Sequence, residues 1–179
     1  MSGMFIMRRL GMIVALGALL GMLGGAVTAS PAVARGPGWT IGPPTPFTFD
    51  ASFCGFEVLV TPVVNQEYTK VLKTADGSMT FLFTGAFAAS LTNLQTGKTI
   101  TENMSGPGKA TINPDGSITE VHTGLDGPNF LAPADQARFG LPGLFIAAGK
   151  LAFSVDAAGN ITSLTLDGRV AVDLCAALS

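Results

Sequence analysis

Apolar and polar residues alternate with a period of two along most of the chain after Phe47, which is the pattern of β-strands with one buried face. Every second residue from Phe47 to Phe53 is apolar, and the apolar positions then move to even numbers from Phe56 to Val60. The change occurs at Cys54–Gly55. Because a β-bulge adds one residue to a strand and so absorbs such a change, the pattern predicts a bulge there.

Turn-forming residues separate the strand-like runs. Asp76–Gly77 and Asp115–Gly116 are dipeptides that favour tight β-hairpins, and Thr96–Gly97 and Gly159–Asn160 stand in equivalent places between other runs. Short strands joined by hairpins, without a long helical pattern, predict an all-β domain of about eight strands.

One segment, from Leu125 to Gly143, lacks the alternation. Pro133 and the residues that follow it predict one or two helical turns, since proline is tolerated at the first helical position. Long connections in compact domains are often functional, and this one is rich in apolar residues. We interpret it as a cap over one end of the fold or over a pocket, with three candidate cap residues: Phe130, Arg138 and Phe139.

Residues 1–34 have the pattern of a secretory signal peptide. Arg8 and Arg9 precede an apolar run from Leu10 to Val27, and the segment ends in an A-x-A cleavage motif. We expect cleavage after Ala34, with cleavage after Ala29 as the alternative. The other interpretation is a retained membrane anchor, because the apolar run approaches the length of a spanning helix.

Composition indicates the domain boundaries and excludes one class of partner. Residues 35–46 contain four prolines and three glycines, which predicts an extended linker and leaves residues 47–179 for one β domain. The chain has 12 acidic and 10 basic residues, so no excess of positive charge predicts a nucleic-acid partner. We expect a secreted protein that does not insert into a membrane after the leader is removed. The sequence does not predict its oligomeric state.

Candidate chemistry is sparse. His122 is the only histidine, and Glu120 shares its face of a strand. If that face lines the interior, the two residues form a carboxylate–imidazole pair that suits acid–base chemistry or anchors a ligand. If it faces solvent, which is the interpretation we favour, they are ordinary surface residues. A zinc site would have to draw its other ligands from Asp and Glu alone, so we predict no metal, no cofactor and no catalytic residue.

The two cysteines, Cys54 and Cys175, predict one disulfide, since free thiols are a liability in an oxidising compartment. Two unpaired buried cysteines are the alternative. A bond between the first and the last strand would make these strands neighbours and close the sheet. The sequence therefore predicts a single antiparallel up-and-down β-barrel of about eight strands, with a β-sandwich as the alternative.

Short segments of the chain resemble small exported proteins of high-GC Gram-positive bacteria. They are FCGF at Phe53–Phe56, LTNLQTGKT at Leu91–Thr99, SGPG at Ser105–Gly108 and DLCAAL at Asp173–Leu178. The resemblance implies a signal peptide and one cysteine near each end of the domain, and it implies no activity. The expected barrel is also similar in shape to lipocalins and allene oxide cyclases, which is an analogy of fold alone.

These patterns favour a binding function over an enzymatic one. We expect a barrel that holds a small apolar or amphipathic ligand beneath the Leu125–Gly143 cap. A structural or interaction protein of the cell envelope is the alternative. The third interpretation is an enzyme of the cyclase or isomerase type, with Glu120, His122 and Arg138 as its polar groups.

Overall fold

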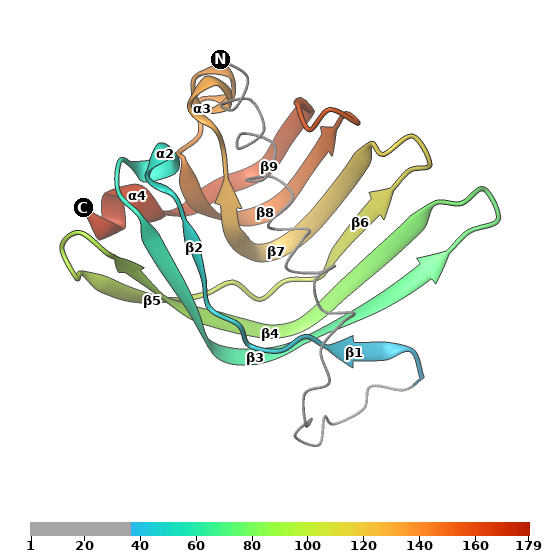
Figure 1. The fold of residues 1–179 in the computed structure, drawn as a ribbon, viewed down its shortest axis with the longest axis horizontal. Coiled ribbons are helices and arrows are strands. Elements are labelled where there is room, and N and C mark those ends of the chain that lie inside the picture. Colours follow the sequence, from blue (N-terminus) through green and yellow to red (C-terminus); the bar gives the residue numbers. More distant parts are fainter. Residues whose placement is uncertain (1–36) are drawn as a thin grey trace, which may run out of the picture.

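The computed structural model describes residues 37–179, and the signal peptide predicted for residues 1–34 lies outside this part of the chain. Within the described range the chain forms nine strands and three short helices (Figure 1). The strands are β1 (Trp39–Ile41), β2 (Phe47–Phe49), β3 (Val58–Lys73), β4 (Met79–Asn93), β5 (Thr99–Asn103), β6 (Gly108–Ile112), β7 (Ile118–Phe130), β8 (Leu144–Val155) and β9 (Ile161–Asp173). The helices are α2 (Ala51–Cys54), α3 (Pro133–Phe139) and α4 (Leu174–Leu178).

All nine strands belong to one antiparallel sheet, as the alternation predicts. The main path of paired strands is β1-β3-β4-β6-β7-β8-β9. β2 and β1 pair with opposite ends of β3 along its outer edge, while β5 and β6 share the opposite edge of β4. The predicted hairpins at Asp76–Gly77, Thr96–Gly97, Asp115–Gly116 and Gly159–Asn160 are all present.

The sheet is strongly curved, but no hydrogen-bonded ladder closes it (Figure 1). The predicted closed barrel required the first and the last strand to pair. In the described range β1 and β9 stand at the two ends of the pairing path and do not pair with each other. The prediction of an antiparallel β-sheet is therefore confirmed, whereas the prediction that backbone hydrogen bonds close it into a barrel is wrong.

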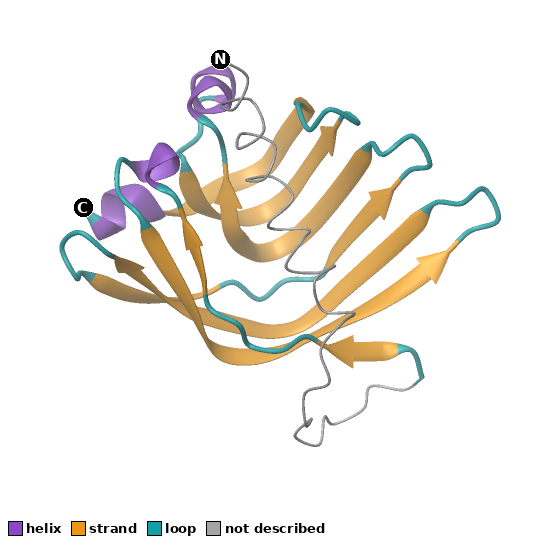
Figure 2. Ribbon diagram, viewed as in Figure 1, coloured by secondary structure: helices purple, strands orange, loops and turns teal. Residues whose placement is uncertain are grey.

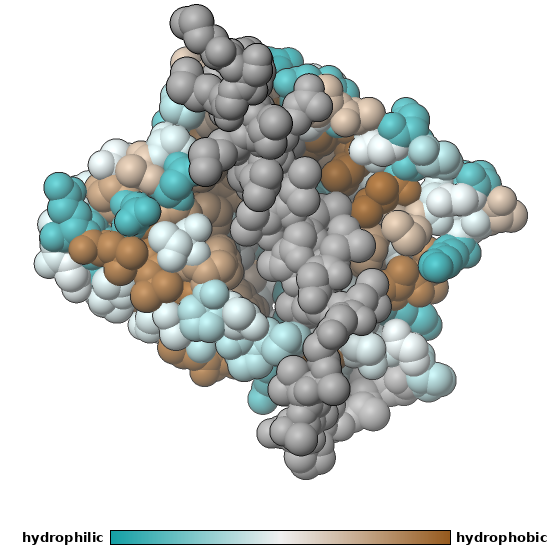
Figure 3. Space-filling model, viewed as in Figure 1, coloured by the Kyte–Doolittle hydropathy of each residue, from teal (hydrophilic) through white to brown (hydrophobic). Residues whose placement is uncertain are grey.

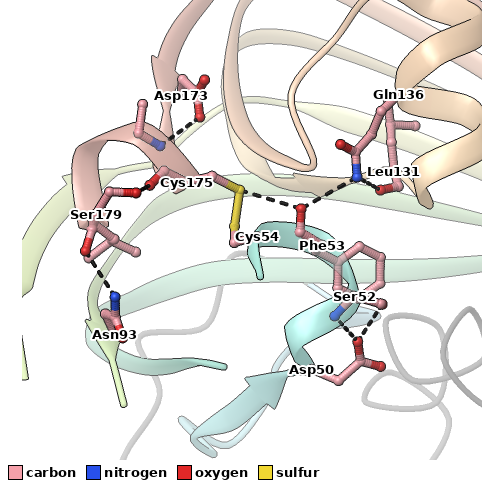
Figure 4. Close-up of a disulfide and its surroundings, with 12 residues drawn as sticks. Asp50, Ser52, Phe53, Cys54, Asn93, Leu131, Gln136, Asp173, Cys175 and Ser179 are labelled. Atoms are coloured by element: carbon pink, nitrogen blue, oxygen red, sulfur yellow. Dashed lines mark hydrogen bonds between the residues drawn. A yellow bond between two sulfur atoms is a disulfide. The ribbon is translucent and has the colours of Figure 1, made fainter. Parts of the chain in front are cut away.

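The predicted disulfide is present, and it joins helices rather than strands (Figure 4). Cys54 ends α2 and Cys175 lies in α4, with their Cα atoms 5.1 Å apart. The prediction of a bulged strand at Cys54–Gly55 is wrong, because this segment forms a helical turn. Asp50 caps the turn by accepting a hydrogen bond from the Ser52 N–H (2.8 Å). Gly55 ends that turn in the left-handed region, with φ 83°.

Side-chain hydrogen bonds reinforce this end of the molecule, where the three helices gather (Figure 2). The Asn93 side-chain amide, buried at the end of β4, donates to the Leu178 carbonyl of α4 (3.1 Å). The Gln136 amide of α3 donates to the Leu131 carbonyl (2.9 Å) and the Phe53 carbonyl (3.4 Å). The two ends of the open sheet are thus held together by a helical clasp, which we define as α2, α4 and the disulfide between them.

A row of glycines crosses β7, β8 and β9. Gly124 on β7 pairs with Gly149 on β8, which pairs with Gly168 on β9. All three have positive φ, a conformation that side-chain-bearing residues rarely adopt. A Cβ atom on Gly149 would collide with the Asp167 carbonyl oxygen, so the backbones approach too closely for any side chain at this point.

Two apolar clusters lie on the two faces of β8. Leu144 and Ile146 belong to the larger cluster, and Phe145 and Ala147 belong to the smaller one. Because successive strand residues point to opposite faces, β8 is buried on both sides at this point. The larger cluster also contains Val58, Val60, Ala89, Leu91, Met104, Leu174 and Leu178, and it therefore joins the β3–β4 hairpin to the helical clasp.

Some large apolar side chains remain exposed, and Figure 3 shows apolar residues in separate groups among polar ones. Val63 and Leu94 are the most exposed of them, at 53% and 48%. Val63 lies at a register shift in β3, and Leu94 lies in the turn between β4 and β5. Both positions are irregular points of the sheet.

Two segments are more ordered than the sequence predicts. Trp39–Ile41, inside the expected linker, forms β1 and pairs with Tyr68–Lys70 of β3. The segment expected to lack strand structure begins with Leu125–Phe130, which continues β7 across a register shift at the Gly127–Pro128 cis peptide. The helix predicted at Pro133 is present as α3.

Loss of the disulfide should lower stability without abolishing the sheet. The bond closes a loop of 121 residues, which corresponds to about 4–5 kcal/mol on the chain-entropy description. A Cys54→Ala/Cys175→Ala variant should unfold at a lower urea concentration than the oxidised protein and retain its far-ultraviolet circular dichroism. Reduced wild type is the matched control and should unfold with the variant. Two free thiols in the intact mass of the wild type would contradict the assignment.

The glycine row supplies a second stability test. Gly149→Ala should destabilise the fold by about 1–3 kcal/mol more than Gly97→Ala, because the new methyl group meets backbone only in the first case. Both glycines have positive φ (123° and 77°), so the control also carries backbone strain, but without the collision. Urea unfolding midpoints measure the difference, and equal midpoints would show that the bend tolerates a side chain.

Candidate functional site

His122 lies flat against the sheet between β4 and β7. Its ring stacks on the Phe83 ring, with centroids 6.1 Å apart and planes 12° from parallel. Gly108 on β6 pairs with both residues and lies between them in the sheet. A Cβ atom at Gly108 would collide with the His122 ring, so the absence of a side chain on β6 makes room for the imidazole.

Two carboxylates hold the two nitrogens of this ring. His122 Nε2 is 3.2 Å from Glu120 Oε2, and His122 Nδ1 is 3.0 Å from Asp126 Oδ1. All three side chains are largely buried, at 15–16% exposure. Since a carboxylate only accepts hydrogen bonds, both ring nitrogens donate, and the imidazole is the doubly protonated cation.

The pKa of His122 is raised from its ordinary value of 6.5 to about 10. Burial opposes the charged ring and lowers the pKa. The hydrogen bonds to Asp126 and Glu120, together with the negative charges of these carboxylates, outweigh that effect. An imidazolium that keeps its proton at neutral pH cannot accept another, so His122 does not serve as a general base there.

Glu67, on β3, approaches the same group. Burial raises its pKa, the charge of Asp126 raises it further and the charge of His122 lowers it. β4 and β6 lie between β3 and β7 in the sheet, which separates the outer two by about 14 Å along a flat sheet. The charges of Asp126 and His122 nevertheless act on Glu67, so the curvature of the sheet brings the three side chains into one electrostatic group. We call these four residues the charge cluster: Glu67, Glu120, His122 and Asp126.

Apolar residues surround the charge cluster on the same face of the sheet. Across β6, Phe81 of β4 lies in line with Glu120, because both pair with Ala110. Phe83 lies in line with His122 in the same way, because both pair with Gly108. On the other side, Phe153 and Leu151 of β8 pair with Glu120 and His122. This face of the sheet therefore combines a charged centre with aromatic and aliphatic neighbours.

The candidate residues taken from the sequence fall into three places. Glu120 and His122 are in contact, and both side chains are largely buried, so they are not the solvent-facing pair that we favoured. Phe130 packs against Phe49 and Phe53 beside the helical clasp, with ring centroids 5.5 Å from each. It is a core residue at this end of the molecule.

Arg138 and Phe139 are the last two residues of α3 and lie beside the start of β9. The Arg138 guanidinium donates to the Ile161 and Thr162 carbonyls (2.7 and 3.2 Å) and lies over the Phe139 ring, 4.7 Å from its centroid. These contacts tie α3 to the start of β9. None of them involves the charge cluster, so the structure does not unite Arg138 with Glu120 and His122 as the enzyme interpretation requires.

Sequence reasoning missed Asp126, Glu67 and Phe83. Asp126 has the same parity as Glu120 and His122, so a longer strand would have placed it on their face. Glu67 and Phe83 gave no comparable signal, because their approach depends on the curvature of the sheet and on the bare Gly108.

Comparison with known proteins returned no matching family model, no similar curated protein and no similar solved structure. Within residues 37–179 no helix is long and apolar enough to cross a membrane, and no three His, Cys, Asp or Glu side chains are arranged to hold a metal ion.

The protonation of His122 can be observed directly, because a single histidine gives a single imidazole resonance. The Hε1 proton should show no titration through pH 6.5 and a midpoint near pH 10. Asp126→Asn removes one charge and should lower that midpoint. A wild-type midpoint near pH 6.5 would contradict the two-carboxylate arrangement.

The same pKa sets a pH dependence of stability. The folded-state value lies above the unfolded one, so the stabilisation by the charged ring is complete below pH 6.5 and disappears as the pH rises through about 10. The urea midpoint of the wild type should fall over this interval relative to that of His122→Gln, which lacks the titrating group.

Proposed function

We propose that the protein binds a small amphipathic ligand on the face of its sheet that carries the charge cluster. The observation that supports this best is the charge cluster, whose Glu120, His122 and Asp126 side chains are largely buried beside Phe81, Phe83 and Leu151. Ligand sites combine an apolar lining with a few polar groups that orient the ligand. The apolar part of the ligand would contact the rings, and its polar end would meet the carboxylates.

The chemistry of the cluster favours binding over catalysis. His122 is protonated between Glu120 and Asp126 and therefore lacks the free lone pair of a general base. Three carboxylates outnumber the one imidazolium, so the cluster accepts hydrogen bonds more readily than it donates them. We infer that the polar end of the ligand is a hydroxyl or amino group.

We propose further that the protein acts outside the cytoplasm. The leader pattern of residues 1–34 supports export, and a disulfide persists in oxidising compartments. A role in the cell envelope based on a free tether has less support, because part of the expected linker is paired with β3 as β1.

Native mass spectrometry of the protein purified from its producing cell tests the binding proposal. The wild type should carry a small molecule, and Phe83→Ala should lower its retention about tenfold or more, because loss of a ring that the ligand covers removes about 1.5–3 kcal/mol of contact. Val121→Ala is the matched control. Val121 is an exposed neighbour of His122 on β7 that points to the opposite face. An empty wild type, or equal retention by Phe83→Ala, would contradict the proposal.

A further inference from the structure

The two edges of the sheet differ in how far other strands cover them. The outer edge of β3 is covered by β2 and β1 at its two ends, and Pro62 and a register shift interrupt the gap between them. Proline and bulges protect an edge from pairing with another chain. β9 forms the other edge, and in the described part of the chain it pairs with β8 alone.

Only the middle of β9 is regular enough to pair again. Register shifts against β8 fall between Ile161 and Ser163 at one end and between Val170 and Val172 at the other. Arg138 occupies the carbonyls of Ile161 and Thr162 as well. The stretch with an unbroken register is therefore Ser163–Val170, which includes Gly168 with its φ of 150°. Exposed residues predominate along it.

This stretch contains the charged triplet Asp167–Gly168–Arg169, whose three residues are all exposed. Lys150 lies opposite Asp167 on β8, yet within residues 37–179 neither Asp167 nor Arg169 takes part in a side-chain ion pair. An edge that is protected by charge usually carries lysine, which repels its own copy. A neutral triplet with one charge on each side of a glycine does the opposite, because it is complementary to itself.

We propose that β9 pairs with β9 of a second copy of this chain, antiparallel and about a twofold axis at Gly168. In this register Asp167 faces Arg169 of the second copy, and Arg169 faces Asp167 of that copy. Leu166 faces Val170 in the same way, so Leu166–Val170 is the part of the stretch that pairs symmetrically about the axis. The axis is perpendicular to the sheet, so both copies curve to the same side and form one continuous sheet.

The alternative registers are less favourable. A displacement by one residue places the apolar face of one strand beside the polar face of the other. Centring the axis on Asp167 places two aspartates opposite each other, and centring it on Arg169 does the same with two arginines. Like charges directly opposite each other destabilise a strand pair, whereas opposite charges stabilise it. Gly168 is thus the centre that satisfies both faces and both charges.

Charge exchange tests this interface. Sedimentation equilibrium of the chain as its producing cell processes it should show a concentration-dependent dimer between about 1 and 500 µM, which corresponds to a binding free energy of roughly 4.5–8 kcal/mol. Asp167→Arg should raise the dissociation constant about tenfold or more, since both symmetry-related pairs become repulsive, and Arg169→Asp should do the same. The Asp167→Arg/Arg169→Asp double variant should return to within about threefold of the wild type.

The variants also distinguish this interface from others. Circular dichroism and the intact mass of the oxidised chain verify that each variant is folded. A wild type that stays monomeric over the whole range would overturn the proposal. So would a dimer that neither single substitution weakens, or a double variant that remains as weak as the single ones, since each result would place the contact elsewhere.

Discussion

The bond between Cys54 and Cys175 is the constraint on which the concave face depends. β3 and β9 lie near opposite ends of the strand order, and in the described chain no ladder joins them. The clasp holds their ends together covalently, and Leu174 and Leu178 of α4 extend the same contact into the larger apolar cluster. The sheet therefore keeps its curvature at one end through packing and one covalent bond, without the continuous hydrogen bonding of a closed barrel.

Local signals in the sequence account for most of the strands and turns. Hairpins at Asp76–Gly77 and Asp115–Gly116 follow from the φ values that these residues tolerate, and the cysteine pair follows from the redox compartment. Closure could not be judged in the same way, because it depends on how far the strands bend. Near Cys54 the helix signals were present in Asp50 and Gly55, but the alternation of the neighbouring phenylalanines outweighed them.

The charge cluster illustrates the limit of strand parity. Parity places Glu120, His122 and Asp126 on one face once the strand is known to continue past Gly124. It cannot state whether that face is concave, which decides between solvent and partial burial. Glu67 enters only through curvature, because it belongs to a strand that is not adjacent to β7. The electrostatics of the site are thus a property of the bent sheet and of no single segment.

Gly108 and His122 constrain each other. The imidazole occupies the space that a side chain at position 108 would need, so the two positions are expected to evolve as a pair. A relative that keeps the histidine must also keep the glycine, whereas loss of the histidine leaves position 108 free to take any residue that favours strands. The joint distribution of residues at these two positions would therefore record whether selection has acted on the buried charge or only on the fold around it.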